Sequence, residues 1–133
     1  MKVVTDGDKH GAEIDISGTV REFREMSQAL LTLKDRLIIE GEQEQDLFYK
    51  NVLNGIEFDL RVQKTSQKQL ITIEIVRNVV CFFGPIECFE KLGQSLLNFF
   101  NEDMLPGQHF HLDYYEGNEL LEPTKHELIF TCK

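Results

Sequence analysis

The residues best suited to chemistry lie near the C-terminus, in the stretch HFHLDYYEGNELLEPTKHELIF, residues 109–130. His109, His111 and Asp113 alternate with apolar residues, and successive side chains on a strand point to opposite faces. The three polar side chains would therefore share one face, where two imidazoles and a carboxylate can bind a divalent metal. The same spacing fits a strand whose histidines make local hydrogen bonds on a contact surface. A contact surface and a metal-binding module or metal-dependent enzyme are the two interpretations.

Other signatures of catalysis do not occur in the sequence. It has no GxSxG motif and no glycine-rich phosphate-binding loop. Cys81, Cys88 and Cys132 are odd in number and form no CxxC pair, and two of them lie in apolar strand patterns typical of buried thiols. We therefore expect a protein that is not an enzyme, carries no cofactor and works in a reducing, cytoplasmic setting.

The composition limits the classes of partner. The 133 residues include 23 Asp or Glu and 14 Lys or Arg, a formal net charge of −9 at pH 7. Such a field repels nucleic acid and anionic lipid and attracts basic partners. No apolar run has the length of a signal peptide or a membrane span. We expect one domain, residues 1–133, that binds neither nucleic acid nor membrane.

A strand, a glycine and a helix follow one another in the first half of the chain. Residues 13–17 alternate between polar and apolar and end at Gly18. Thr19 and Glu22 then form a capping-box pattern, which predicts a helix over residues 19–33. The apolar stripe of this helix consists of Val20, Phe23, Met26, Leu30 and Leu33.

The same order occurs again in the second half. Residues 79–83 are an apolar strand that ends at Gly84, and Pro85 begins a helix that extends to about residue 100. Aligning Gly18 with Gly84 places similar residues opposite each other: Val20 and Ile86, Phe23 and Phe89, Met26 and Leu92, Leu30 and Leu96. Because two strands follow each helix, the chain reads βαββ twice. This pattern indicates an internal duplication with half-repeats at residues 12–77 and 79–132.

These elements predict an α+β fold. Residues 56–63 and 69–76 read as strands of one hairpin, with its turn at residues 64–68, and residues 109–115 and 126–132 read as a second pair. Strands joined in hairpins are antiparallel. We therefore predict a mostly antiparallel six-stranded sheet with both helices on one face and the other face open.

Alternation predicts which side chains belong to each face of this sheet. The inward set is Ile56, Phe58, Leu60, Val62, Ile71, Ile73, Ile75, Phe110, Leu112, Tyr114, Leu128, Phe130 and Cys132. The outward set is Glu13, Asp15, Glu57, Asp59, Arg61, Glu74, His109, His111, Asp113, Glu127 and Thr131. The open face is therefore expected to be acidic. The segment Glu40–Asp46 is a further acidic stretch, read either as a solvated loop or as a contact arm for a basic partner.

The C-terminal part of the chain also resembles a known family. It combines a strand–glycine–helix unit, a His-x-His-Leu-acidic-Tyr strand, a Gly-Asn and Leu-Leu-x-Pro loop and a final apolar strand. The matching residues are His109, His111, Leu112, Asp113, Tyr114, Tyr115, Gly117, Asn118, Leu120, Leu121, Pro123 and Glu127–Phe130. This pattern, over roughly residues 79–132, resembles small bacterial immunity proteins of polymorphic toxin and contact-dependent inhibition systems.

The resemblance implies a non-enzymatic protein that binds and neutralises a cognate toxin domain. Many such toxins are nucleases with basic clefts, which an acidic face could occupy. The residues expected to contact the partner are Glu57, Asp59, Glu74, His109, His111 and Asp113, with Tyr115, Glu116 and Glu119 at the rim. No metal ligand is assigned in this interpretation.

Overall fold

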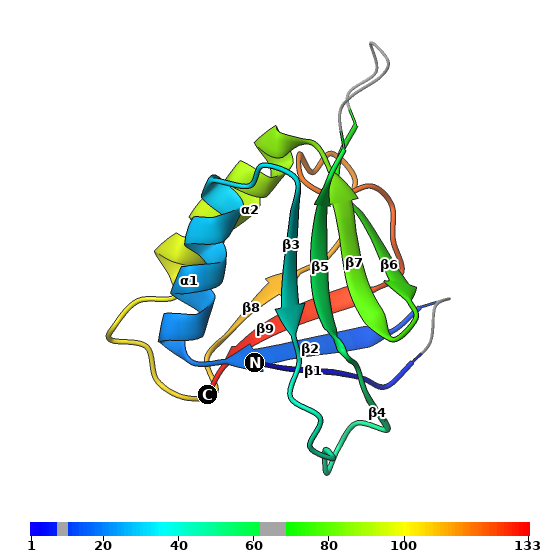
Figure 1. Ribbon diagram of the computed structural model, residues 1–133, viewed down its shortest axis with the longest axis vertical. Coiled ribbons are helices and arrows are strands. Elements are labelled where there is room, and N and C mark those ends of the chain that lie inside the picture. Colours follow the sequence, from blue (N-terminus) through cyan, green and yellow to red (C-terminus); the bar gives the residue numbers. More distant parts are fainter. Residues whose placement is uncertain (8–10, 62–68) are drawn as a thin grey trace.

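The computed structural model describes residues 1–7, 11–61 and 69–133. Within these ranges the chain forms two helices and nine strands (Figure 1). In chain order they are β1 (Lys2–Thr5), β2 (Glu13–Gly18), α1 (Val20–Leu31), β3 (Arg36–Glu40), β4 (Asn51–Val52), β5 (Gly55–Leu60), β6 (Thr72–Val76), β7 (Val79–Gly84), α2 (Ile86–Phe99), β8 (His109–Leu112) and β9 (Glu127–Cys132). The turn expected at residues 64–68 and the inward position expected for Val62 lie outside the described residues.

The strands form two mixed sheets. The five-stranded sheet has the order β4-β1-β2-β9-β8, and the four-stranded sheet has the order β3-β5-β7-β6. In each sheet one central pair is parallel, β2 with β9 and β5 with β7, and the other pairs are antiparallel. Figure 1 shows the strands of the two sheets running in clearly different directions, with both helices side by side next to them.

The predicted α+β class and the two helices are confirmed, but the single six-stranded antiparallel sheet is wrong. The expected hairpin of β5 with β6 does not form, because β7 lies between these strands and pairs with both. The antiparallel pairing of β8 with β9 is as predicted. The polar segment after the first helix contains an edge strand, β3, and the first residues of the chain form β1. The prediction included neither strand.

The two halves of the chain have a similar order of strands around their helix, and each sheet contains strands from both halves. β1 and β2 precede α1, and β3 and β5 follow it; β6 and β7 precede α2, and β8 and β9 follow it. Each leading hairpin pairs in parallel with the trailing pair of the other half, β2 with β9 and β7 with β5. The register also corresponds, because Gly18 is opposite Cys132 and Gly84 is opposite Leu60. The internal duplication with half-repeats at residues 12–77 and 79–132 stays a prediction. In the structure β6, which lies before residue 77, forms a hairpin with β7 ahead of α2.

The first helix begins with the capping box that its sequence predicts, whereas Pro85 is the extended N-cap of α2 and the helix itself begins at Ile86. Thr19 caps α1 through its side chain, which accepts a hydrogen bond from the Glu22 amide at 3.1 Å, and Glu22 completes the capping box. At the crossing with α2, Gly93 lies against the Ser27 carbonyl of α1. These two positions correspond when Gly18 is aligned with Gly84. A small residue is needed there because the helix backbones approach closely.

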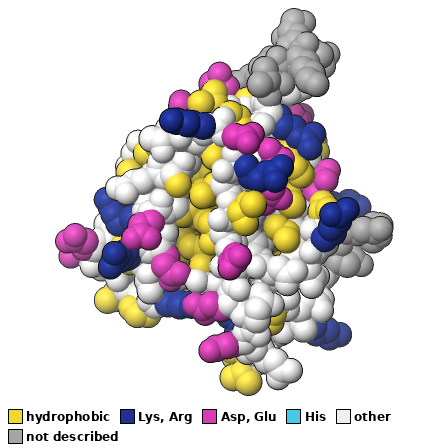
Figure 2. Space-filling view, viewed as in Figure 1, with side chains coloured by type: hydrophobic (Ala, Val, Ile, Leu, Met, Phe, Trp, Pro, Cys, Tyr) yellow, Lys and Arg dark blue, Asp and Glu magenta, His cyan; other side chains and the backbone are white. Residues whose placement is uncertain are grey.

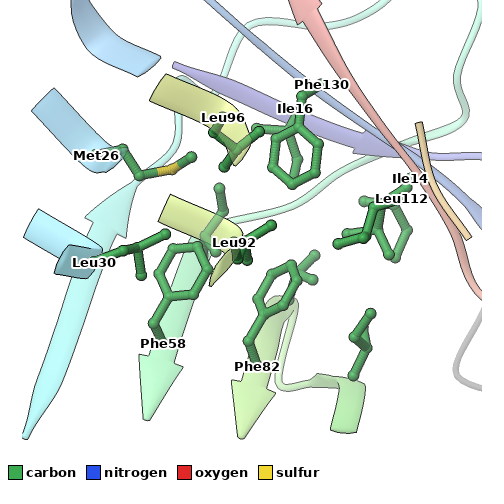
Figure 3. Packing of buried hydrophobic residues seen from close by; sticks show 14 of the residues in the cluster. Ile14, Ile16, Met26, Leu30, Phe58, Phe82, Leu92, Leu96, Leu112 and Phe130 are labelled. Carbon is green, nitrogen blue, oxygen red and sulfur yellow. The ribbon is translucent and has the colours of Figure 1, made fainter. Parts of the chain in front are cut away.

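The hydrophobic core lies between the two sheets and the helices. Figure 3 shows apolar side chains from α1, α2 and both sheets pointing toward one another. Phe58 and Phe82 of the four-stranded sheet stack with ring centroids 4.7 Å apart, and Phe23 of α1 stacks on Phe100 at 4.0 Å. Both sheets thus bury one face against this core; on the outer face of the five-stranded sheet Val4 is buried as well.

Candidate functional site

Three of the predicted contact residues lie together on the outer face of the four-stranded sheet. Glu57 and Asp59 are on β5 and Glu74 is on β6. Arg36 of the edge strand β3 places Nε 2.9 Å from Glu57 Oε1 and a guanidinium nitrogen 4.0 Å from Asp59 Oδ2. One arginine therefore lies beside two of the three carboxylates, and a second one, Arg61, lines the same pocket as Glu74.

The buried thiol of Cys81 lies close to these carboxylates. Cys81 of β7 lies between β5 and β6, and its Sγ is 3.7 Å from Glu57 Oε2. Burial and the nearby charges of Glu57, Glu74 and Asp59 raise the pKa of Cys81 to about 11. The thiol is therefore protonated at neutral pH. Its environment is electronegative, whereas a nucleophilic cysteine is activated by an electropositive one.

Apolar side chains interrupt the charges on this face. Ile38 of β3 is 62% exposed and Val76 of β6 is 41% exposed, while the Arg61 guanidinium stacks over the Phe83 ring at 4.2 Å. We call Ile38, Glu57, Asp59, Glu74 and Val76 the acidic face. Figure 2 shows acidic, basic and hydrophobic side chains mixed over the strands of this sheet, with no helix above them. This face therefore combines charged groups with exposed apolar side chains.

A second group of predicted residues lies at the edge of the five-stranded sheet. His111, Asp113, Tyr115 and Glu119 line an open groove of about 520 Å³ between α2 and β8. Lys91 of α2 forms an ion pair with Glu119 at 3.3 Å across this groove. Among the described strands β8 pairs only with β9, so its other edge is free at the groove.

The two histidines contact each other on the outward side of β8. Their ring centroids are 4.7 Å apart in an edge-to-face arrangement, and His109 Nδ1 lies 3.0 Å from the Gly107 carbonyl oxygen. This is the local hydrogen bonding that the strand interpretation predicts for at least one of them. In the described part of the chain, no three His, Cys, Asp or Glu side chains form a group that could hold a metal ion.

The structure thus divides the predicted acidic surface between two sheets. Glu57, Asp59 and Glu74 form one cluster, and the β8 groove holds another. Glu116, which was expected at the rim of the contact surface, is exposed in the turn after β8. Tyr114, which was expected to point inward, is 37% exposed. The inward position predicted for Tyr114 is wrong, because β8 ends at Leu112 and the strand alternation ends with it.

The outer face of the five-stranded sheet carries a third set of carboxylates. Tyr49 donates a hydrogen bond to Glu13 Oε1 at 2.7 Å, and Thr131 donates to Asp15 Oδ2 at 3.3 Å. No described residue donates a hydrogen bond to the buried Oδ1 of Asp15. Burial raises the pKa of Asp15, and the neighbouring charges of Glu13 and Asp46 act in the same direction. This carboxylate is therefore costly to keep ionised.

Several exposed apolar residues belong to the candidate surfaces although alternation does not identify them. Ile38 lies in a strand that was not predicted, and Leu47 and Phe48 follow the acidic segment and are almost fully exposed. The sequence does contain a signal for Leu47 and Phe48. They are two large apolar residues in a run of Glu, Gln, Asp and Lys that has neither a helical nor a strand period, and such residues are not expected to be buried in the core.

Comparisons with protein-family models, curated proteins and solved structures gave no match for this chain. The class that the fold defines is therefore an α+β protein with two mixed sheets and two helices. In its described residues neither helix is long and apolar enough to cross a membrane.

Proposed function

We propose that this chain is an immunity-type protein that binds a cognate toxin domain and neutralises it by stoichiometric contact. The proposed place of action is the cytoplasm, where the three cysteines would stay reduced; all three are buried. The proposal combines the C-terminal sequence pattern with a surface suited to a basic protein partner.

The acidic face is the observation that carries the proposal. It joins three carboxylates to the exposed side chains of Ile38 and Val76 on an uncovered sheet. Apolar groups at the centre of an interface supply binding energy when they are desolvated, and surrounding charges select the partner and accelerate association. The β8 groove, with His111, Asp113, Tyr115 and Glu119, is the second candidate contact region.

The charge of the chain favours one class of toxin. With a net charge of −9, the protein attracts a domain whose active cleft is basic, such as a nuclease. Carboxylates on a rigid sheet can occupy positions that the phosphates of a nucleic acid would take in that cleft. Binding of this kind blocks the substrate without any chemistry by the inhibitor.

The test is co-expression with the toxin domain encoded directly upstream of the gene. We expect a large secreted protein there whose C-terminal domain stops growth when it is expressed alone. Co-expression of this chain should restore growth, and the purified pair should form a 1:1 complex in size-exclusion chromatography with light scattering. A neighbouring toxin that this chain neither binds nor neutralises would contradict the proposal.

A further inference from the structure

Leu47 and Phe48 are the most exposed large apolar side chains in the described part of the chain. They are 95% and 90% exposed, although each would bury considerable apolar area in a core. They lie in the segment between β3 and β4, which Figure 1 shows beyond the ends of β3 and β5. Folding buries neither side chain, so both are available for contact with a partner.

Polar contacts on both sides of this pair hold the segment in place. Asp46 Oδ1 accepts hydrogen bonds from the Phe48 and Tyr49 amides at 2.8 and 3.0 Å, and Lys2 Nζ lies 3.2 Å from Asp46 Oδ2. The Tyr49 hydroxyl donates to Glu13. The amide hydrogen bonds, that of Phe48 first, hold the pKa of Asp46 below its usual value, so the turn is intact at neutral pH. The dipeptide is thus presented in a fixed position, which lowers the entropy lost on binding.

The charge around the dipeptide selects the kind of surface that can receive it. Glu40 and Glu44 are exposed in the segment that precedes the dipeptide, Asp46 next to it is paired with Lys2, and the exposed Lys50 follows it. An apolar anchor with exposed carboxylates on its N-terminal side fits an apolar pocket with Lys or Arg at the matching side of its rim. An anionic membrane fits less well, because its surface would repel the same carboxylates.

We infer that Leu47 and Phe48 are the apolar anchor of the toxin contact and insert into a pocket of the toxin domain that has a basic rim. This inference rests on the proposed function and adds a second contact to the acidic face. The two surfaces are connected along the chain, because β3 carries Ile38 and leads directly into the segment. Each anchor side chain that is buried on binding should contribute a factor of roughly ten or more to the affinity.

The test compares the wild-type chain with the double variant Leu47→Ala/Phe48→Ala in binding the purified upstream-encoded toxin domain, made catalytically inactive for handling. Leu105→Ala is the matched control, because Leu105 is 67% exposed in a different loop. The double variant should keep the wild-type melting temperature, since the two side chains are solvated, and should bind about 100-fold more weakly. The control should bind like wild type.

The other outcomes are distinguishable. If wild type binds and the double variant binds equally well, the anchor is refuted and the proposed function stands. If wild type does not bind at all, the proposed function fails and this inference fails with it. The same two proteins are also tested for concentration-dependent dimerisation and for sedimentation with phosphatidylcholine vesicles. Loss of either behaviour in the double variant, without loss of toxin binding, would assign the dipeptide to a second copy of the chain or to a membrane.

Discussion

The crossing of α1 and α2 at Gly93 makes a prediction whose size follows from the structure. A Cβ atom at this position would lie 2.9 Å from the Ser27 carbonyl oxygen and 3.0 Å from Leu30 Cβ. Ordinary contacts of a Cβ begin at 3.4 Å, so the helices would have to separate by about 0.5 Å. The carbonyl is part of a helix backbone and cannot rotate away, and a close-packed core transmits such a shift.

Two opposing effects determine the result of Gly93→Ala. Alanine favours a helix interior over glycine by about 1 kcal/mol, whereas an extra carbon in a filled interface costs about 1–3 kcal/mol. We expect the free energy of unfolding to decrease by about 1 kcal/mol as the net effect. Urea titration followed by far-UV circular dichroism measures it, because the chain has no Trp for fluorescence.

A neighbouring position separates the two effects. Gln94 is exposed on α2, so the difference in stability between Gln94→Ala and Gln94→Gly gives the helix propensity without crowding. Both variants lose the same hydrogen bond from Gln94 to Asn98, and that loss cancels. The free energy of unfolding of Gln94→Ala minus that of Gln94→Gly is the gain from helix propensity alone. If Gly93→Ala stabilises the protein by this full amount, the extra methyl group has no steric cost and the described helix contact is wrong.

Three further predictions concern other parts of the molecule. Asp15→Asn should stabilise the protein at pH 7, because burial raises the pKa of this carboxyl in the folded state. The gain in stability should disappear below about pH 3.8, where the carboxyl is protonated in both the folded and the unfolded state. A variant that is less stable than wild type at pH 7 would refute this reasoning. The β6–β7 turn has positive φ at Arg77 and Asn78, so Arg77→Asn/Asn78→Gly should raise the free energy of unfolding by about 1 kcal/mol in urea titration, and an unchanged value would contradict the turn geometry. Elemental analysis of the purified protein should find no stoichiometric metal; a metal that is lost in His109→Ala/His111→Ala would favour the metal-binding alternative.

Local features of this fold could be predicted from the sequence. The capping box at Thr19 and the apolar stripes identify both helices, because these signals depend on residues within a few turns of one another. The correspondence of Gly18 with Gly84 is also visible in the sequence, and both residues end strands that lead into helices. Alternation correctly assigns Phe58, Phe130 and Leu112 to the core.

The pairing of distant strands could not be predicted in the same way. Alternation tells which face a side chain occupies but does not tell which strand is the neighbour. An antiparallel hairpin of β5 with β6 agrees with the sequence as well as the observed order does, and only the packing of β7 between them decides the matter. The predicted contact surface is wrong in its extent for the same reason. Asp59 and Asp113 were expected on the same open face, but Asp59 lies on the four-stranded sheet and Asp113 lies in the groove beside β8.

Recognition through the acidic face is tested by measuring the affinity for the toxin domain as a function of salt concentration. The variants are Asp59→Lys/Glu74→Lys on the acidic face and, with the same change in net charge, Glu102→Lys/Asp103→Lys in the exposed loop after α2. We expect the first variant to bind at least tenfold more weakly and with a smaller salt dependence, while the second stays close to wild type. Equal affinities and equal salt dependence for the two variants would contradict recognition through the acidic face.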